Sequence, residues 1–280
     1  MIDTPSDASA NTWDTTLARA FDAAFDDAAR GVVEARTHLS AWDTAGELTP
    51  HQHRAGQVFE IIALALHRAG TAAAPSPSRQ VFDKLLPQIA QDIHAVRLLT
   101  SLGFPYQAVT VAVSTFEHGV MLASIGSNDE RAGKWLAHTD PARNMDNVFD
   151  TLERALNNLD SDFPGLKAKL QVLREGKLQG PYHEMYQPLC AFKHGNPVVQ
   201  RHMEGMAADA LPLSIFAAAD RRAIIAAFWA IEAAIRAAWF ALISFIPHHL
   251  PDAPDWNPIM RGINRAANEL ALIRAHTERK

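Results

Sequence analysis

The residues with the clearest potential for chemistry lie in the segment Pro181 to Pro197, PYHEMYQPLCAFKHGNP. His183, Cys190 and His194 follow one another at intervals of seven and four residues, which places them along one face of a helix. Imidazole and thiolate are ligand types that zinc accepts. A carboxylate from a neighbouring helix, Glu117, could complete the set. The candidate metal ligands are therefore Glu117, His183, Cys190 and His194, although this spacing matches no recognised zinc signature.

Cys190 and His194 also lie one helical turn apart, so they fit a nucleophile and its base. A reactive cysteine requires a lowered pKa and access to solvent. The structural alternative is that Cys190 is a small core residue. Lys193 and His194 then close the helix before Gly195, where a positive charge is favoured by the helix dipole.

A second chemical feature is a carboxylate inside an apolar helix. The segment Phe104 to Ile125, FPYQAVTVAVSTFEHGVMLASI, has apolar residues at helical spacing, and Pro105 suits the first turn. Glu117 interrupts the apolar pattern. It must reach water, find a partner or stay protonated, because burying an unpaired carboxylate is costly. The structural alternative to a functional role is an interhelical salt bridge with Lys193 or Arg97.

These residues must be positioned by helices, because apolar residues recur at helical spacing through most of the chain and no segment alternates like a sheet strand. We predict an all-α multi-helix bundle. The expected helices cover residues 13–39, 51–69, 79–102, 104–125, 127–136, 141–159, 161–175, 181–194 (with a kink at Pro188), 221–246 and 258–273. A capping box at Ser127 and Glu130 is expected to start one of them.

The stretch Ala223 to Ile246 is apolar on nearly all sides and has the length of a membrane span. Glu232 and Arg236 lie in its middle, however, at a spacing that lets them pair on a helix. Centred charges are rare in a lone span. We therefore predict a buried central helix at about 221–246, and no membrane association.

Domain organisation follows from the linkers. Residues 1–11 are short, polar and without periodicity, so we expect them to be disordered. Residues 70–78, GTAAAPSPS, read as a linker. We predict an N-terminal helical hairpin at 12–70 and a main bundle at 79–280, with one continuous domain at 12–280 as the alternative.

The overall composition narrows the classes of function. A net charge of −5 argues against a general nucleic-acid binder, although a local basic patch remains compatible with it. The single cysteine excludes an internal disulfide and fits a reducing cytoplasm. The polar, acidic start of the chain is unlike a signal peptide. We expect a cytoplasmic protein without a cofactor, since Gly-rich phosphate loops, GxSxG and CxxC are all missing from the sequence.

Three segments together resemble a known group of proteins. They are, in chain order, LLTSLGFPYQAVTVAVSTFEHGVMLASI, KWLAH and the stretch from Tyr186 through CAFKHGNP. Together they resemble bacterial helical families of unknown function that are related to the HEPN superfamily (higher eukaryotes and prokaryotes nucleotide-binding). The similarity covers roughly residues 85–200. It implies an all-helical fold and a setting near mobile elements and phage defence, and it singles out Glu117, His138 and His194.

The chain departs from that pattern in two ways. The arginine that those families place ahead of the glutamate is absent, with Ser114 or its neighbours in that place. The arginine that precedes the histidine in HEPN ribonucleases is also missing, because residues 187–190 are Gln, Pro, Leu and Cys. Without it, no cation from that motif stabilises a developing phosphoryl charge. The resemblance thus favours the fold more than nuclease activity.

Our leading hypothesis is a binding or interaction component of a stress or phage-defence module, with a protein partner or a second copy of the chain. The first alternative is a nuclease or other phosphodiesterase whose catalytic residues are Glu117, His138, Lys193 and His194, with glutamate or histidine as general base. The second alternative is a metal-binding helical bundle.

Overall fold

The protein is a bundle of α-helices, as the sequence predicts. The computed structural model describes residues 48–70, 75–138, 152–166, 172–174, 177–179, 186–193, 221–250 and 256–279. These contain eight helices and one short hairpin. The helices are α2 (Thr49–Ala69), α3 (Pro77–Ser101), α4 (Pro105–Gly126), α5 (Asp129–Leu136), α6 (Leu152–Asp162), α8 (Gln187–Lys193), α10 (Arg221–His249) and α11 (Trp256–Arg279), and the strands are β1 (Val172–Arg174) and β2 (Lys177–Gln179).

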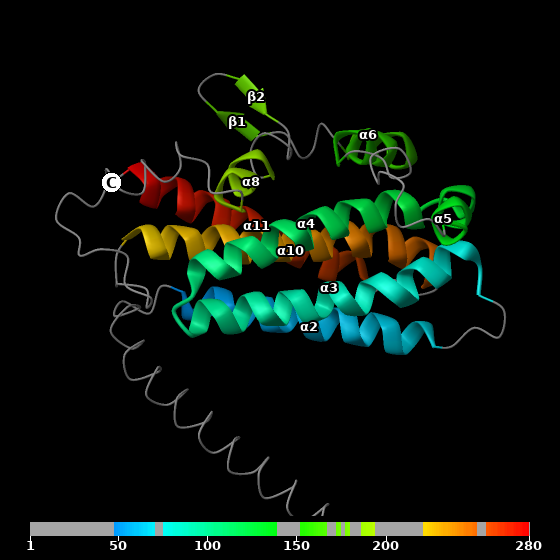
Figure 1. Cartoon of the computed structure of the whole chain (residues 1–280), viewed down its shortest axis with the longest axis horizontal. Helices are drawn as coiled ribbons and strands as arrows, with labels where there is room; N and C mark the ends of the chain where they lie inside the picture. Colours follow the sequence, from blue (N-terminus) through cyan, green and yellow to red (C-terminus); the bar gives the residue numbers. More distant parts are fainter. Residues whose placement is uncertain are drawn as a thin grey trace, which may run out of the picture.

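Helix α10 lies at the centre of the bundle, where α2, α3, α4 and α11 all pack against it (Figure 1). Helix α4 runs beside α10 and α3 and contacts α6 and α8, while α5 packs on both α3 and α4 (Figure 1). The predicted buried central helix is therefore confirmed. The predicted N-terminal hairpin at 12–70 stays a prediction, because residues 1–47, including the expected helix at 13–39, lie outside the described residues.

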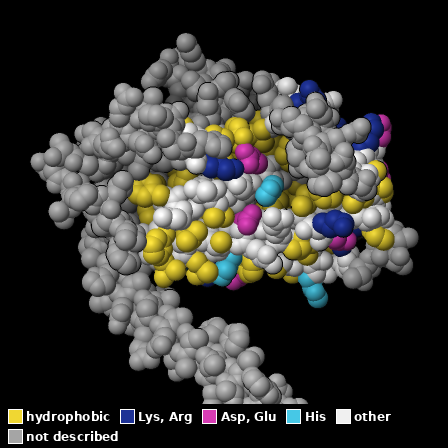
Figure 2. Space-filling view, viewed as in Figure 1, with side chains coloured by type: hydrophobic (Ala, Val, Ile, Leu, Met, Phe, Trp, Pro, Cys, Tyr) yellow, Lys and Arg dark blue, Asp and Glu magenta, His cyan; other side chains and the backbone are white. Residues whose placement is uncertain are grey.

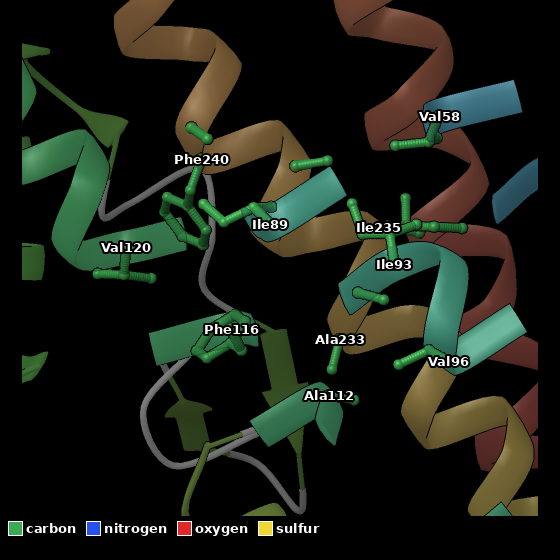
Figure 3. Close-up of a cluster of buried hydrophobic side chains, with 14 of the residues drawn as sticks. Val58, Ile89, Ile93, Val96, Ala112, Phe116, Val120, Ala233, Ile235 and Phe240 are labelled. Carbon is green, nitrogen blue, oxygen red and sulfur yellow. The ribbon is translucent and has the colours of Figure 1, made fainter. Parts of the chain in front are cut away.

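One continuous hydrophobic cluster joins α2, α3, α4 and α10, and Figure 3 shows its middle. Phe116 of α4 meets Phe240 of α10 edge to face, with ring centroids 5.8 Å apart, an arrangement that aromatic pairs favour. The labelled residues come from all four helices: Val58, Ile89, Ile93, Val96, Ala112, Phe116, Val120, Ala233, Ile235 and Phe240.

Helices α4 and α10 approach each other closely because a glycine faces a backbone. A Cβ atom placed on Gly119 would lie only 2.5 Å from the carbonyl oxygen of Ala237 and 2.6 Å from its Cα. Small residues allow backbones this near to one another, and α10 has a buried alanine on almost every turn. Gly119 therefore sets the separation of the two innermost helices.

The expected pairing of Glu232 with Arg236 within the central helix is confirmed, and α11 adds a second cation. Arg236 Nε donates to Glu232 Oε1 at 3.0 Å, and Arg274 Nε donates to Oε2 at 3.1 Å. Glu232 and Arg274 are 1% and 2% exposed. The Arg274 guanidinium also lies 3.6 Å from the ring centre of Trp229. A buried charge needs this degree of pairing to be tolerated.

The central helix is longer than its sequence pattern predicts. It continues through Pro247 to His249, because a proline removes a single donor and Leu250 N still closes the last turn on Ile246 O at 2.8 Å. His249 packs against the rings of Phe82 and Phe245. Burial, aided by nearby cationic groups, lowers the pKa of His249 to about 4, so the ring is neutral at pH 7.

Other predicted boundaries differ from the structure. The helix expected at 161–175 is wrong over Val172–Arg174, which form the strand β1, paired antiparallel with β2. The kink expected at Pro188 stays a prediction, because residues 181–185 of the expected helix lie outside the described residues. The N-cap of α5 is Asn128 and not Ser127: its side chain accepts from Glu130 N and Arg131 N.

Two of the described helices are long and apolar enough to cross a membrane, namely Pro105–Gly126 and Ile224–His249. In the bundle, 67% and 78% of their most apolar 18-residue windows are buried. Burial of this extent is what the core helices of a helical bundle show.

The close approach of α4 to α10 predicts that Gly119→Ala destabilises the bundle by about 1–3 kcal/mol, because the new methyl group meets rigid backbone. Urea unfolding followed by circular dichroism measures the change. Gly133→Ala on α5 is the matched control, since nothing lies within 4 Å of its Cβ position. It is expected to stabilise slightly, as alanine favours a helix over glycine. Equal effects of the two substitutions would contradict the close-packing argument.

Candidate functional site

The candidate site lies on a partly exposed strip of α4. Ser114, Glu117, His118 and Met121 are half-buried, whereas their neighbours on the helix at positions 112, 113, 115, 116, 119 and 120 are buried. Spacings of three and four residues place the four on one side of α4. The apolar pattern of the sequence thus buries most of the helix and leaves this strip free to hold polar side chains. Figure 2 shows acidic, basic and histidine side chains gathered on the face formed by α3 and α4.

The short helix α8 packs on this strip and supplies two polar partners for Glu117. The Tyr186 hydroxyl donates to Glu117 Oε1 at 2.6 Å. The Lys193 ammonium lies 3.7 Å from Oε2 of the same carboxylate, and it also bonds Ser114 Oγ at 3.3 Å. The interhelical salt bridge expected for Glu117 is therefore formed, and Lys193 is its partner.

The sequence of α8 explains why these groups point the same way. Tyr186 directly precedes α8, and Leu189 and Lys193 follow it after three and seven residues, so the three side chains lie on one side of the helix. Leu189, between the two polar groups, is completely buried and belongs to the hydrophobic cluster. An apolar anchor flanked by two donors is thus presented to α4.

The site is partly open to water. The side chains of Glu117 and Lys193 are 29% and 28% exposed, and solvent screening weakens an ion pair of this kind. A hydroxyl that donates to a carboxylate at short distance makes a stronger bond. The hydrogen bond from Tyr186 is therefore the more important of the two attachments.

Both other titratable groups at the contact stay protonated near neutral pH. Burial raises the pKa of the Tyr186 hydroxyl, and its bonds to Cys190 and Glu117 add to the rise. Burial also raises the pKa of the Cys190 thiol, although the hydrogen bond with Tyr186 and the charge of Lys193 oppose that change. A buried thiol with a raised pKa is a poor nucleophile. This argues against the nucleophile-and-base interpretation of Cys190.

A histidine and a carboxylate continue the polar face toward α3. His118 Nδ1 lies 3.9 Å from Asp92 Oδ2, which is beyond hydrogen-bond distance, and the side chains are 42% and 25% exposed. Glu117 and His118 are consecutive on α4, so Asp92, His118, Glu117 and Lys193 form one band of charge across α3, α4 and α8. The sequence alone identified Glu117 and Lys193 in this band.

The structure brings together some of the predicted site residues. Glu117 and Lys193 meet. His138 follows the end of α5, and the described contacts of Glu117 and Lys193 do not include it. His194 and His183 lie outside the described residues, so their proposed catalytic and metal-binding roles stay predictions. Among the side chains that the structure describes, no group of three or more His, Cys, Asp or Glu is placed to hold a metal ion.

Tyr186 and Ser114 are the members of the site that sequence reasoning did not assign. The heptad interval from Tyr186 to Lys193 is a signal in the sequence, since it places an aromatic hydroxyl and an ammonium on one helical face. It does not say which helix receives them. Glu117 lies 69 residues before Tyr186, and only the packing of α8 on α4 brings them into contact.

A scan against models of protein families finds no match to this chain, and searches of curated proteins and of solved structures find none either.

The geometry predicts that Glu117 and Tyr186 are energetically coupled. A double-mutant cycle of Glu117→Ala and Tyr186→Phe is expected to give a favourable coupling of about 1–2 kcal/mol, because the hydroxyl donates to a charged acceptor. The free energy of unfolding of the four proteins gives the coupling. The control cycle uses Glu130 and Lys134, a pair at 2.7 Å on the surface of α5, and should show none beyond error. If the two substitutions changed the free energy of unfolding additively, the hydrogen bond between Glu117 and Tyr186 would not contribute to the docking of α8.

Proposed function

We propose that this chain acts by binding a protein partner or a second copy of itself, and not by catalysis of its own. The observation that carries the proposal is the state of the Glu117 carboxylate. Both its oxygens are engaged, one by the Tyr186 hydroxyl and the other by the Lys193 ammonium. A general base needs a carboxylate that is free to take a proton from its substrate. Here the carboxylate instead fastens one helix to another.

The charge of the chain supports a protein as the partner. A net charge of −5 gives no general attraction to the phosphate backbone of a nucleic acid. The resemblance to bacterial HEPN-related families supplies the setting that we propose, a cytoplasmic stress or phage-defence module. That setting rests on the sequence similarity over residues 85–200.

The proposal is tested by the mass of the particle that the chain forms in cells. We expect the tagged chain, cross-linked in cells and purified, to run in light scattering well above the 30.7 kDa of one chain, as a homo-oligomer or with a stoichiometric partner. The same tag on an unrelated protein of similar charge controls for adventitious capture. A monomer with no stoichiometric partner at cellular concentrations would count against a binding function.

A nuclease or other phosphodiesterase is the second candidate, because two of the four predicted catalytic residues, Glu117 and Lys193, meet with partly exposed side chains. On this alternative, Glu117→Ala and His194→Ala each lower RNA cleavage at least tenfold, the scale of general acid–base catalysis, and relieve toxicity in cells. Lys134→Ala, on the exposed surface of α5, is the control. Unchanged cleavage in correctly folded variants would exclude the alternative.

A further inference from the structure

Among the elements that the structure describes, α8 packs chiefly on α4. The contacts of Tyr186 and Lys193 with α4 reach Ser114 and Glu117. Leu189 is its fully buried apolar side chain. The attachment therefore consists of a hydroxyl, an isobutyl group and an ammonium, spaced along one side of a short helix.

We propose that α8 is an intramolecular occupant of a helix-binding surface on α4, and that a partner helix with the same pattern displaces it. The partner is an amphipathic helix that carries an aromatic hydroxyl, a leucine three residues later and a lysine or arginine four residues beyond it. This inference rests on the proposed binding function and names the surface that performs it.

Helix α8 is suited to leave that surface. It has seven residues, fewer than the roughly 12–15 that an isolated helix needs in water, so its stability depends on docking. Its ion pair is partly exposed and therefore weak. Segments held by few buried contacts open with a much smaller free energy than the whole molecule. The α4–α10 core beneath it, by contrast, is closely packed.

The surface that α8 would leave behind is selective. A replacement helix without donors would cover the Glu117 carboxylate and exclude water from it, which is costly. A replacement helix must therefore bring hydrogen-bond donors and positive charge, as well as an apolar group for the place of Leu189. This is the helix-in-groove type of recognition, with anchors on one face of an amphipathic helix.

The single cysteine of the chain is a natural reporter of this opening. Cys190 lies in α8 beside Tyr186, it is half-buried, and burial raises the pKa of its thiol. Alkylation of Cys190 is therefore slow while α8 is docked and fast when it leaves. The labelling rate of the full-length chain measures the population of the undocked state.

The first experiment follows iodoacetamide labelling of Cys190 in Glu117→Gln and Tyr186→Phe. We expect each to raise the rate about tenfold, because Tyr186→Phe removes the hydrogen bond and Glu117→Gln removes the charge that strengthens it and attracts Lys193. Glu130→Gln, which breaks an ion pair on α5, should leave the rate unchanged. The rate should depend only weakly on low urea concentrations, since local opening exposes little surface. Unchanged rates in both variants, or a steep urea dependence typical of global unfolding, would overturn the proposal.

The second experiment adds a synthetic peptide of residues 184–196 with Cys190 replaced by serine. We expect it to accelerate labelling of the wild-type chain with a saturable concentration dependence, whereas the same peptide carrying Lys193→Glu should not. No acceleration, or equal acceleration by both peptides, would overturn the proposal. The assay contains only the chain and the peptide, so its outcome is separate from whether a partner is recovered from cells.

Discussion

The close approach of α4 to α10 is the constraint on which the remaining structure depends. Gly119 leaves room for the backbone of Ala237, and the alanines of α10 keep that helix narrow enough for neighbours to surround it. Helices α2 and α3 then cover one side of the pair, α6 and α8 attach to α4, and α5 packs on both α3 and α4. Because α4 is fixed against the central helix, the polar strip it carries is fixed as well.

The bundle solves the problem of a carboxylate in an apolar helix in two ways. Glu232 is 1% exposed and is enclosed by two guanidinium groups, from Arg236 and Arg274. Glu117 is 29% exposed and is held by a tyrosine and a lysine from one short helix. The first arrangement is sealed, and removing Glu232 would leave two guanidinium groups without the carboxylate that they share. The second has access to water, so its partners can be exchanged at small cost. This contrast is why we assign binding to the α4–α8 contact.

What the sequence predicts well is what local physics decides. Apolar residues at helical spacing identify α2, α3, α4, α10 and α11, and a first-turn proline marks the start of α4. The pairing of Glu232 with Arg236 also follows from a spacing within one helix. The partner of Glu117 is a long-range contact, for which two candidates, Lys193 and Arg97, fit equally well until the helices are placed in space.

The features that the sequence did not predict also depend on contacts between segments that are distant in the chain. The strand β1 has only three residues, too few for an alternating pattern, and its stability comes from pairing with β2. The pattern of apolar residues ends at Ile246, but α10 continues through Pro247 to His249, because Leu250 N closes its last turn on Ile246 O. Tyr186 and Arg274 escaped notice because each acts on a residue of a different helix. Side chains that bridge distant segments carry no periodic signal.

The sealed contact between α10 and α11 also limits how the chain can vary in length near its end. A slip of α11 by one residue would rotate Arg274 by about 100° away from Glu232, and an insertion or deletion between the two helices would have a similar effect unless the connection absorbed it. Ending the chain ahead of Arg274 would leave Oε2 of Glu232 without the donor that α11 supplies, while Arg236 still pairs with Oε1. The contact of the Arg274 guanidinium with Glu232 therefore fixes the register of α11 against α10. We expect Glu232 and Arg274 to be replaced together or not at all.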